Sequence, residues 1–167
     1  MTGEAVPPPV VVRFAVSDEF DRLRWVELES DKLMEQIGIG PFPADDRSRL
    51  AEAVVVFAAG DPAVGFVSLR IVDDEAHVEQ LSVVPDHGGR GIGRDLLNEA
   101  IRGARNQELA GVTLTTFRDV PWNAPFYRRV GFVEVVEPSP ELADIRITEG
   151  TSGLDALGPR LAMRLAL

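Results

Sequence analysis

The residues most able to do chemistry in this chain fall in three short segments. His77 and Glu79 are two residues apart in a stretch that alternates apolar and polar residues. In a strand these two side chains, with those of Leu81 and Val83, point to the same face, where His77 or Glu79 could accept a proton. Asn123 and Tyr127 are four residues apart in a segment of helical character, so both can contact one ligand. The third segment is a cluster of glycines between the other two.

This cluster holds four glycines within six residues, with two arginines beside them. The segment, called the glycine loop below, consists of Gly88, Gly89, Arg90, Gly91, Ile92, Gly93 and Arg94. Glycines at a helix start let backbone N–H groups converge on a phosphate, and the helix dipole favours the negative charge. A flexible strand-to-helix turn is the alternative. The key residues of the P-loop and of the dinucleotide-binding fingerprint are missing, so neither nucleotide fold is indicated.

The elements that must position these segments follow one another as strand, loop and helix. The apolar pattern predicts a strand over 76–84 and a helix from 92 to about 107, with the glycine loop between them. A strand over 112–117 and a helix over 121–130 should carry the Asn123 segment. Further strands are expected over 10–16, 54–58, 64–72, 132–136 and 160–165, and further helices over about 17–38, 45–53 and 140–151.

Composition narrows the class of protein. The 167 residues suit one domain, which we expect to span 1–167. Lys and Arg number 17 against 27 Asp and Glu, and the net charge of −10 argues against a nucleic-acid partner. The absence of Cys excludes a thiol nucleophile, and two His give no basis for a metal site. No stretch has the ~20 apolar residues of a membrane helix, so we expect a cytoplasmic, bacterial-like protein without a membrane partner.

The glycine loop resembles the pyrophosphate-binding signature of the GNAT family of N-acetyltransferases, whose pattern is Arg/Gln-x-x-Gly-x-Gly/Ala. Gly91 and Gly93 match this pattern. Gly88 departs from it, because the family usually carries Arg or Gln there. Arg90 or Arg94 could supply the missing positive charge.

Residues 120–132 resemble the family's other recurring motif, in which Asn, an aromatic residue followed by Tyr, and Gly-Phe are regularly spaced. Both motifs occur in the right order and on the expected elements, and the resemblance covers about 54–132. It implies a mixed α/β (α+β) fold. A central, twisted, mostly antiparallel sheet of six to seven strands would contain one splayed parallel pair and be flanked by about four helices.

The resemblance also implies where acetyl-CoA binds. The splayed pair would be the strands over 76–84 and 112–117, and the pantetheine arm would insert between them as a pseudo-strand. Free backbone groups at Leu81 and Val83, with Ser82 between them, would bind this arm. One backbone N–H there could polarise the thioester carbonyl.

The implied reaction is direct transfer of an acetyl group to a primary amine, without an acyl-enzyme because no Cys exists to carry one. Tyr127, the only Tyr, is the expected acid for the departing thiolate. Glu79 is the favoured base and His77 the second choice, acting through ordered water. Asn123 is expected to bond the pantetheine arm or a nearby water, and Phe126 to graze the cofactor from the core. The alternatives are a buried anchor for Tyr127, a helix cap for Asn123, and an exposed acid and an edge histidine for the two bases.

The expected acceptor is a small-molecule amine. The alternatives are a protein N-terminus or lysine side chain, and a non-catalytic acyl-CoA-binding module. Acidic residues where the family builds its acceptor site could attract a cationic amine or form a solvated helix face. They are Glu27, Glu29, Asp31, Glu35, Asp45 and Asp46. Family members often dimerise, so a homodimer is compatible with the resemblance.

Overall fold

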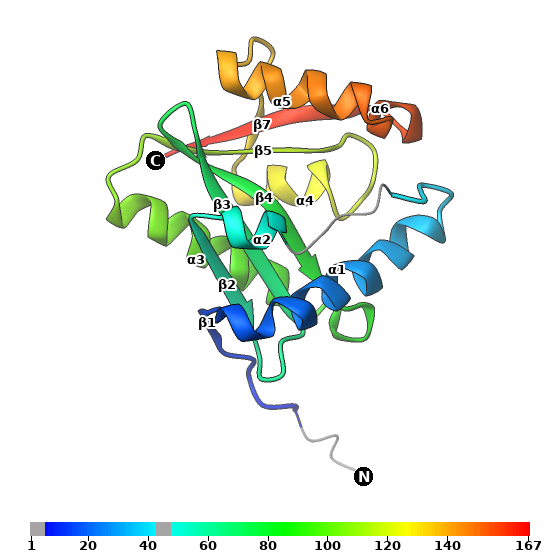
Figure 1. The fold of residues 1–167 in the computed structure, drawn as a ribbon, viewed down its shortest axis with the longest axis vertical. Coiled ribbons are helices and arrows are strands. Elements are labelled where there is room, and N and C mark those ends of the chain that lie inside the picture. The colour runs from blue at the N-terminus through cyan, green and yellow to red at the C-terminus, as the bar shows by residue number, and fades with distance from the viewer. Residues whose placement is uncertain (1–5, 43–47) are drawn as a thin grey trace.

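The computed structural model describes residues 6–42 and 48–167, which form a seven-stranded sheet with helices on both faces (Figure 1). Its strands are β1 (Val12–Phe14), β2 (Val55–Ala59), β3 (Gly65–Val72), β4 (Glu75–Val83), β5 (Gly111–Phe117), β6 (Val133–Glu134) and β7 (Arg160–Ala166). They lie in the order β1-β2-β3-β4-β5-β7-β6. All neighbours are antiparallel except β4 and β5. The predicted mixed, mostly antiparallel fold with one parallel pair is confirmed.

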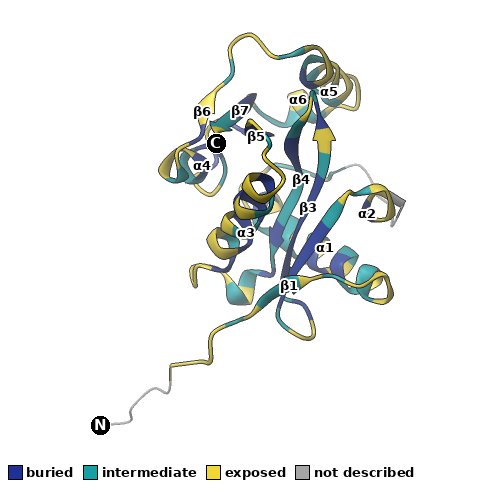
Figure 2. Ribbon diagram, turned by 90° about the vertical axis from the view of Figure 1, so that its left-hand side faces the viewer, coloured by how far each residue is buried: buried dark blue, intermediate teal, exposed yellow. Residues whose placement is uncertain are grey.

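Helices α3 and α4 cover one face of the sheet, and α1, α2 and α5 cover the other (Figure 2). The helices are α1 (Phe20–Glu35), α2 (Ser48–Glu52), α3 (Ile92–Asn106), α4 (Ala124–Val130), α5 (Pro140–Thr151) and α6 (Leu154–Leu157), with 3-10 turns η1 (Ser17–Glu19) and η2 (Pro85–His87). The described residues form six α-helices, whereas the resemblance implied about four and the sequence pattern predicted five ranges; α6, a single short turn, had no predicted range. Residues 45–47 of the helix predicted over 45–53 lie outside the described part. No helix in 6–42 or 48–167 combines the length and the apolar character needed to cross a membrane.

The apolar stripe of α3 anchors the glycine loop to the sheet. Its buried residues are Ile92, Leu96, Leu97, Ala100, Ile101 and Ala104. They pack in one cluster with strand residues that include Val67, Val78 and Leu114. Fully burying one Leu or Ile side chain contributes about 1.5–3 kcal/mol. This packing therefore fixes the position of the start of α3 relative to the sheet.

β4 and β5 pair over only part of their lengths. The paired residues are Ala76 with Val112, His77 with Thr113 and Val78 with Leu114. Beyond these pairs β4 continues along β3, and β5 continues along β7. The facing edges of the two strands therefore lose their ladder partners, which leaves backbone N–H and C=O groups that a ligand could bind.

A β-bulge lies where the two strands part. The register between β3 and β4 shifts by one residue, so that Glu79 has no partner on β3. A bulge changes which face the following side chains point to. Leu81 and Val83 pack against the core cluster that contains α3, whereas Glu79 contacts α2 on the other face. The alternation expected to place His77, Glu79, Leu81 and Val83 on one face is therefore wrong beyond Glu79.

Candidate active site

The glycine loop presents free backbone donors to open space. Gly89 has φ +71° and Gly91 has φ +82°, in the left-handed region that glycine tolerates. The first helical hydrogen bond runs from Asp95 N–H to Gly91 O at 2.9 Å, so the first three N–H groups of α3 have no partner within the helix. A Cβ built on Gly89 or Gly91 would meet no atom within 4 Å. The loop thus has both the donors and the room that an anion needs.

Gly88 has a different role in this loop. Its N–H donates to Pro85 O at 2.9 Å, which closes η2. A Cβ on Gly88 would lie only 3.1 Å from the same oxygen. An Arg or Gln in this position would therefore crowd the turn. The side chains of Arg90 and Arg94 are exposed, and they remain the nearby sources of positive charge.

Asn123 precedes the first residue of α4 but does not cap the helix with its side chain. Its Oδ1 instead accepts a hydrogen bond of 2.7 Å from Thr116 Oγ1 on β5. This bond fixes the side-chain amide of Asn123 to the strand that leaves β4. The helix-cap alternative therefore has no support in the geometry.

Tyr127 follows one turn later on α4 and is 9% exposed. Its ring packs against Phe126 and Phe132, with ring centroids 5.1 and 5.8 Å away. Burial raises the pKa of the Tyr127 phenol well above its usual range. The hydroxyl therefore keeps its proton at neutral pH and can act only as a donor of that proton or as a neutral hydrogen-bonding group.

His77 is buried, with 3% of its surface exposed, and its Nδ1 lies 2.9 Å from Thr113 Oγ1 on β5. Burial, and then the charge of Arg70, lowers the pKa of His77 to about 4. The imidazole is therefore neutral at pH 7 and a weak proton acceptor. Its hydrogen bond joins the two strands within their paired segment.

Glu79 lies between two arginines on the α1–α2 face. Arg49 Nη2 of α2 is 3.1 Å from Glu79 Oε1, and Arg70 Nε of β3 is 2.9 Å from Glu79 Oε2. The Glu79 side chain is 21% exposed, so water can reach it. The structure thus brings this carboxylate, and not the imidazole of His77, to an accessible position beside the parting strands.

Arg70 was not among the predicted site residues, although one signal in the sequence indicates its position beside His77. Asp73 and Asp74 both have positive φ and form a two-residue turn between β3 and β4. Counting outward from such a hairpin turn gives the register of both strands, and here it pairs Arg70 with His77.

The predicted pantetheine-binding residues lie on the part of β4 that has no partner on β5. The side chain of Ser82 is 2% exposed, and its Oγ accepts a hydrogen bond of 2.8 Å from Gln80 Nε2. Leu81 and Val83 direct their side chains into the core. Val84 N–H donates to Val64 O on the β3 side, so by alternation the backbone groups of Ser82 also face β3. Leu81 and Val83, on either side of Ser82, can therefore offer backbone groups to a ligand at the open edge.

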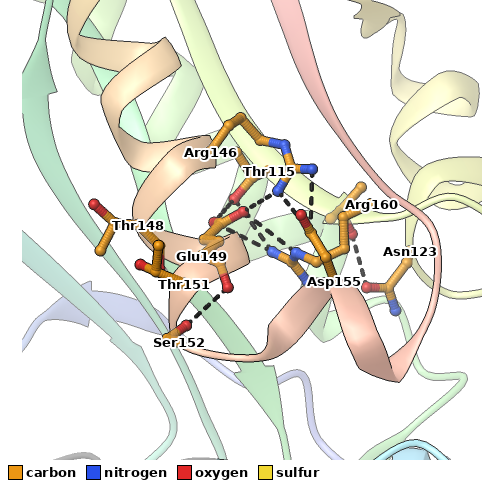
Figure 3. A network of polar contacts seen from close by, with 10 residues as sticks. Thr115, Asn123, Arg146, Thr148, Glu149, Thr151, Ser152, Asp155 and Arg160 are labelled. Carbon is orange, nitrogen blue, oxygen red and sulfur yellow. Dashed lines mark hydrogen bonds and ion pairs between the residues drawn. The ribbon is translucent and has the colours of Figure 1, made fainter.

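A polar network joins β5, β7 and α5 next to the point where β5 parts from β4 (Figure 3). Glu149 of α5 accepts a hydrogen bond from Thr115 Oγ1 and forms ion pairs with Arg146 at 2.7 Å and Arg160 at 3.3 Å. Burial alone would raise the pKa of Glu149, but Arg160, Thr115 and Arg146 together outweigh burial and lower it. Thr115 directly follows the last β5 residue that pairs with β4. The network therefore holds β5 where it parts from β4.

The acidic residues of α1 are partly compensated within the helix. Glu27 and Glu29 each form an ion pair with a basic residue one turn away. Burial, and then the charge of Glu27, raises the pKa of Asp31 to about 6. Asp45 and Asp46 lie outside the described residues. This helix therefore offers less negative charge to a cationic acceptor than its sequence suggests.

The sequence over residues 17–132 matches the family model described as "Acetyltransferase (GNAT) family". The chain belongs to the GNAT acetyltransferase family. As a GNAT protein it is an acyl-CoA-dependent N-acyltransferase. The matched region contains the glycine loop, both parting strands and α4, and it ends before α5, α6 and β7.

Solved structures share this fold over most of the GNAT chain. A Mycobacterium tuberculosis protein in complex with CoA is 21% identical, with a TM-score of 0.66, covering 94% of this chain and 99% of that one. The PaiA N-acetyltransferase of Thermoplasma acidophilum, in complex with coenzyme A, is 18% identical, with a TM-score of 0.67 and coverage of 96% and 100%. N-acetylglutamate synthase of Neisseria gonorrhoeae is 18% identical, with a TM-score of 0.72, over 98% of this chain and 36% of that one.

Proposed function

We propose that this GNAT protein transfers an acetyl group from acetyl-CoA directly to the primary amine of a small molecule. One observation carries the proposal: β4 loses its partner on β5 just before the chain reaches the free N–H groups at the start of α3. An extended amide arm with a pyrophosphate at one end fits those two features in that order. The glycine loop, with Arg90 or Arg94, would hold the pyrophosphate.

The pantetheine arm would then follow the free backbone groups of Leu81 and Val83, on either side of Ser82. The amide of Asn123, which Thr116 fixes in place, would bond the arm or a water beside it. Phe126 packs against the core cluster and would contact the arm only at its edge. Acetyl-CoA supplies an acetyl group activated as a thioester.

The acceptor nitrogen attacks the thioester carbonyl carbon, the carbon–sulfur bond breaks, and the products are an N-acetylated amine and the CoA thiol. Tyr127 donates the proton that the departing sulfur needs, because its phenol is protonated at neutral pH and it lies on α4 one turn after Asn123. Glu79 takes the amine proton through water. His77 stays second, because it is buried and has a pKa of about 4.

Release of free CoA from acetyl-CoA over a pooled panel of primary amines tests the proposal. We expect amine-dependent CoA release by the wild-type protein. Thermal stabilisation by acetyl-CoA without release over the whole panel would favour the non-catalytic module instead. Release with peptides but with no small amine would favour a protein acceptor. If calorimetry detected no binding of CoA at millimolar concentration, the glycine loop would not be the predicted cradle and the proposed function would fall.

A further inference from the structure

A guanidinium group lies beside the predicted base Glu79. Arg70 of β3 contacts this carboxylate through its Nε, 2.9 Å from Glu79 Oε2. At short range such a local charge dominates over distant, solvent-screened ones. Arg70 can therefore attract a negative group of the acceptor, although the whole chain carries −10.

Arg70 has donors available for such a group. Its Nε is buried and lies 2.9 Å from Glu79 Oε2 without an aligned hydrogen bond. The side chain as a whole is 41% exposed. Within residues 6–42 and 48–167 its ionic partner is Glu79, which leaves the outer nitrogens facing solvent. A guanidinium presents its N–H groups as a planar fork that matches both oxygens of a carboxylate.

The position of Arg70 relates it directly to the reacting groups. It pairs across the β3–β4 ladder with His77, and β4 leaves β5 one residue after His77. The predicted base Glu79 occupies the bulge at the same place. The outer nitrogens of Arg70 therefore lie on the side of the sheet from which an amine would approach Glu79.

Glu79 and Arg70 place a carboxylate next to a guanidinium group. An α-amino acid carries the complementary charges, an ammonium next to a carboxylate. In an α-amino acid one carbon separates the amino group from the carboxylate. Placing the amino group at Glu79 brings the carboxylate beside Arg70, whose nitrogen is in contact with Glu79. We infer that the acceptor is an α-amino acid, held by Arg70 through its carboxylate and by Glu79 through its amino group. This inference rests on the proposed acetyl transfer, and the products are then an N-acetyl amino acid and the CoA thiol.

Matched acceptors test the inference directly. Each of the twenty amino acids would be compared with its decarboxylated amine and its α-amide, with kcat and KM measured from CoA release. We expect at least one amino acid to exceed both of its derivatives by about tenfold to a hundredfold in kcat/KM, as for a hydrogen bond to a charged group. Arg70→Gln should remove this preference mainly by raising KM for the amino acid, and Arg70→Lys should restore part of it.

Arg102→Gln is the matched control, because Arg102 is an exposed arginine on α3 that pairs with Glu99. It should leave the preference unchanged. Equal turnover of amino acids and their amides would overturn the inference while acetyl transfer stood. So would an equal loss over the whole panel in Arg70→Gln, or binding of acetyl-CoA with no amino acid acetylated. Absence of CoA binding in calorimetry would instead mark failure of the proposed function itself.

Discussion

Thr115 and Thr116 are neighbours on β5, and their hydroxyl groups donate hydrogen bonds to opposite faces of the sheet. Thr115 bonds Glu149 of α5, whereas Thr116 bonds Asn123 at the start of α4. β5 is therefore tied on both faces directly after the last residue that pairs with β4. The helix that carries Tyr127 and the helix that carries Glu149 are both positioned by this one point on the strand.

Glu149→Gln should destabilise the protein, because it removes the charge that compensates Arg146 and Arg160 in a mostly buried network. Breaking such a pair costs roughly 3 kcal/mol. The pKa of Glu149 is lowered in the folded protein, so its stabilisation is present above the ordinary value of 4.5 and is lost as the pH falls below it. Thermal unfolding of both proteins between pH 3 and 7 should show a difference that shrinks toward acid.

Glu99→Gln provides the comparison for that experiment, since Glu99 pairs with Arg102 on the exposed side of α3. Exposed pairs one turn apart contribute little to stability. Its melting temperature should stay close to that of the wild type. An equal loss of stability in both variants would contradict the prediction that the Glu149 network stabilises the fold more than an exposed ion pair does.

Gly91→Ala should weaken binding of CoA, because a methyl group enters the space above the glycine loop and the φ of +82° strains any other residue. Gly153→Ala is the matched control: Gly153 has φ +93°, equally open surroundings, and lies before α6. Both variants should lose about 1–2 kcal/mol of stability from the left-handed backbone. Calorimetry with CoA should separate them, with a raised Kd for Gly91→Ala alone.

Tyr127→Phe should lower kcat for CoA release by about a hundredfold if the phenol is the general acid. The Kd for CoA and the melting temperature should change little, since the ring and its contacts with Phe126 and Phe132 remain. Burial holds the pKa of Tyr127 above the working range, so its deprotonation should not appear in the pH–rate profile below pH 10. Unchanged kcat would remove Tyr127 from the acid role and leave the family assignment intact.

His77 should titrate with a pKa of about 4 in the folded protein, because burial disfavours the imidazolium. Between pH 4 and the ordinary value of 6.5, the unfolded chain binds a proton that the folded one does not, so stability falls as the pH is lowered through this window. The chain has only two histidines, and NMR can follow both. Titration of His77 near 6.5 would contradict the buried position and restore it as a candidate base.

Local patterns in the sequence predicted most elements of the fold. The apolar stripe of α3 and the apolar run of β3 depend on nearby residues, and the bounds of both elements were predicted to within one or two positions. The helix over 140–151 was also correct, although its sequence is the least regular. The glycine loop was recognisable because φ values such as that of Gly91 require this residue type.

Features that depend on distant residues were not predictable in this way. The bulge is an exception, because it does leave a mark in the sequence: Glu79 and Gln80 are two consecutive polar residues, and they shift the apolar positions from 76 and 78 to 81 and 83. Glu149 and Thr115 are 34 residues apart along the chain and meet only through the packing of α5 on the sheet. The two arginines beside Glu79 come from α2 and β3, so the local charge could not be read from the segment that carries the base.

The extra residue at Glu79 divides β4 into two parts with different surroundings. Before Glu79, β4 is hydrogen-bonded to β5. After Glu79, the edge of β4 that faces β5 has no strand partner, while the side chains of Leu81 and Val83 pack in the core. Removing that single residue would turn every later side chain to the opposite face of the sheet, so that Leu81 and Val83 would leave the cluster that contains α3 and Ser82 would point into it. The length of β4, counted to one residue, thus decides which face of the sheet each side chain after Glu79 occupies.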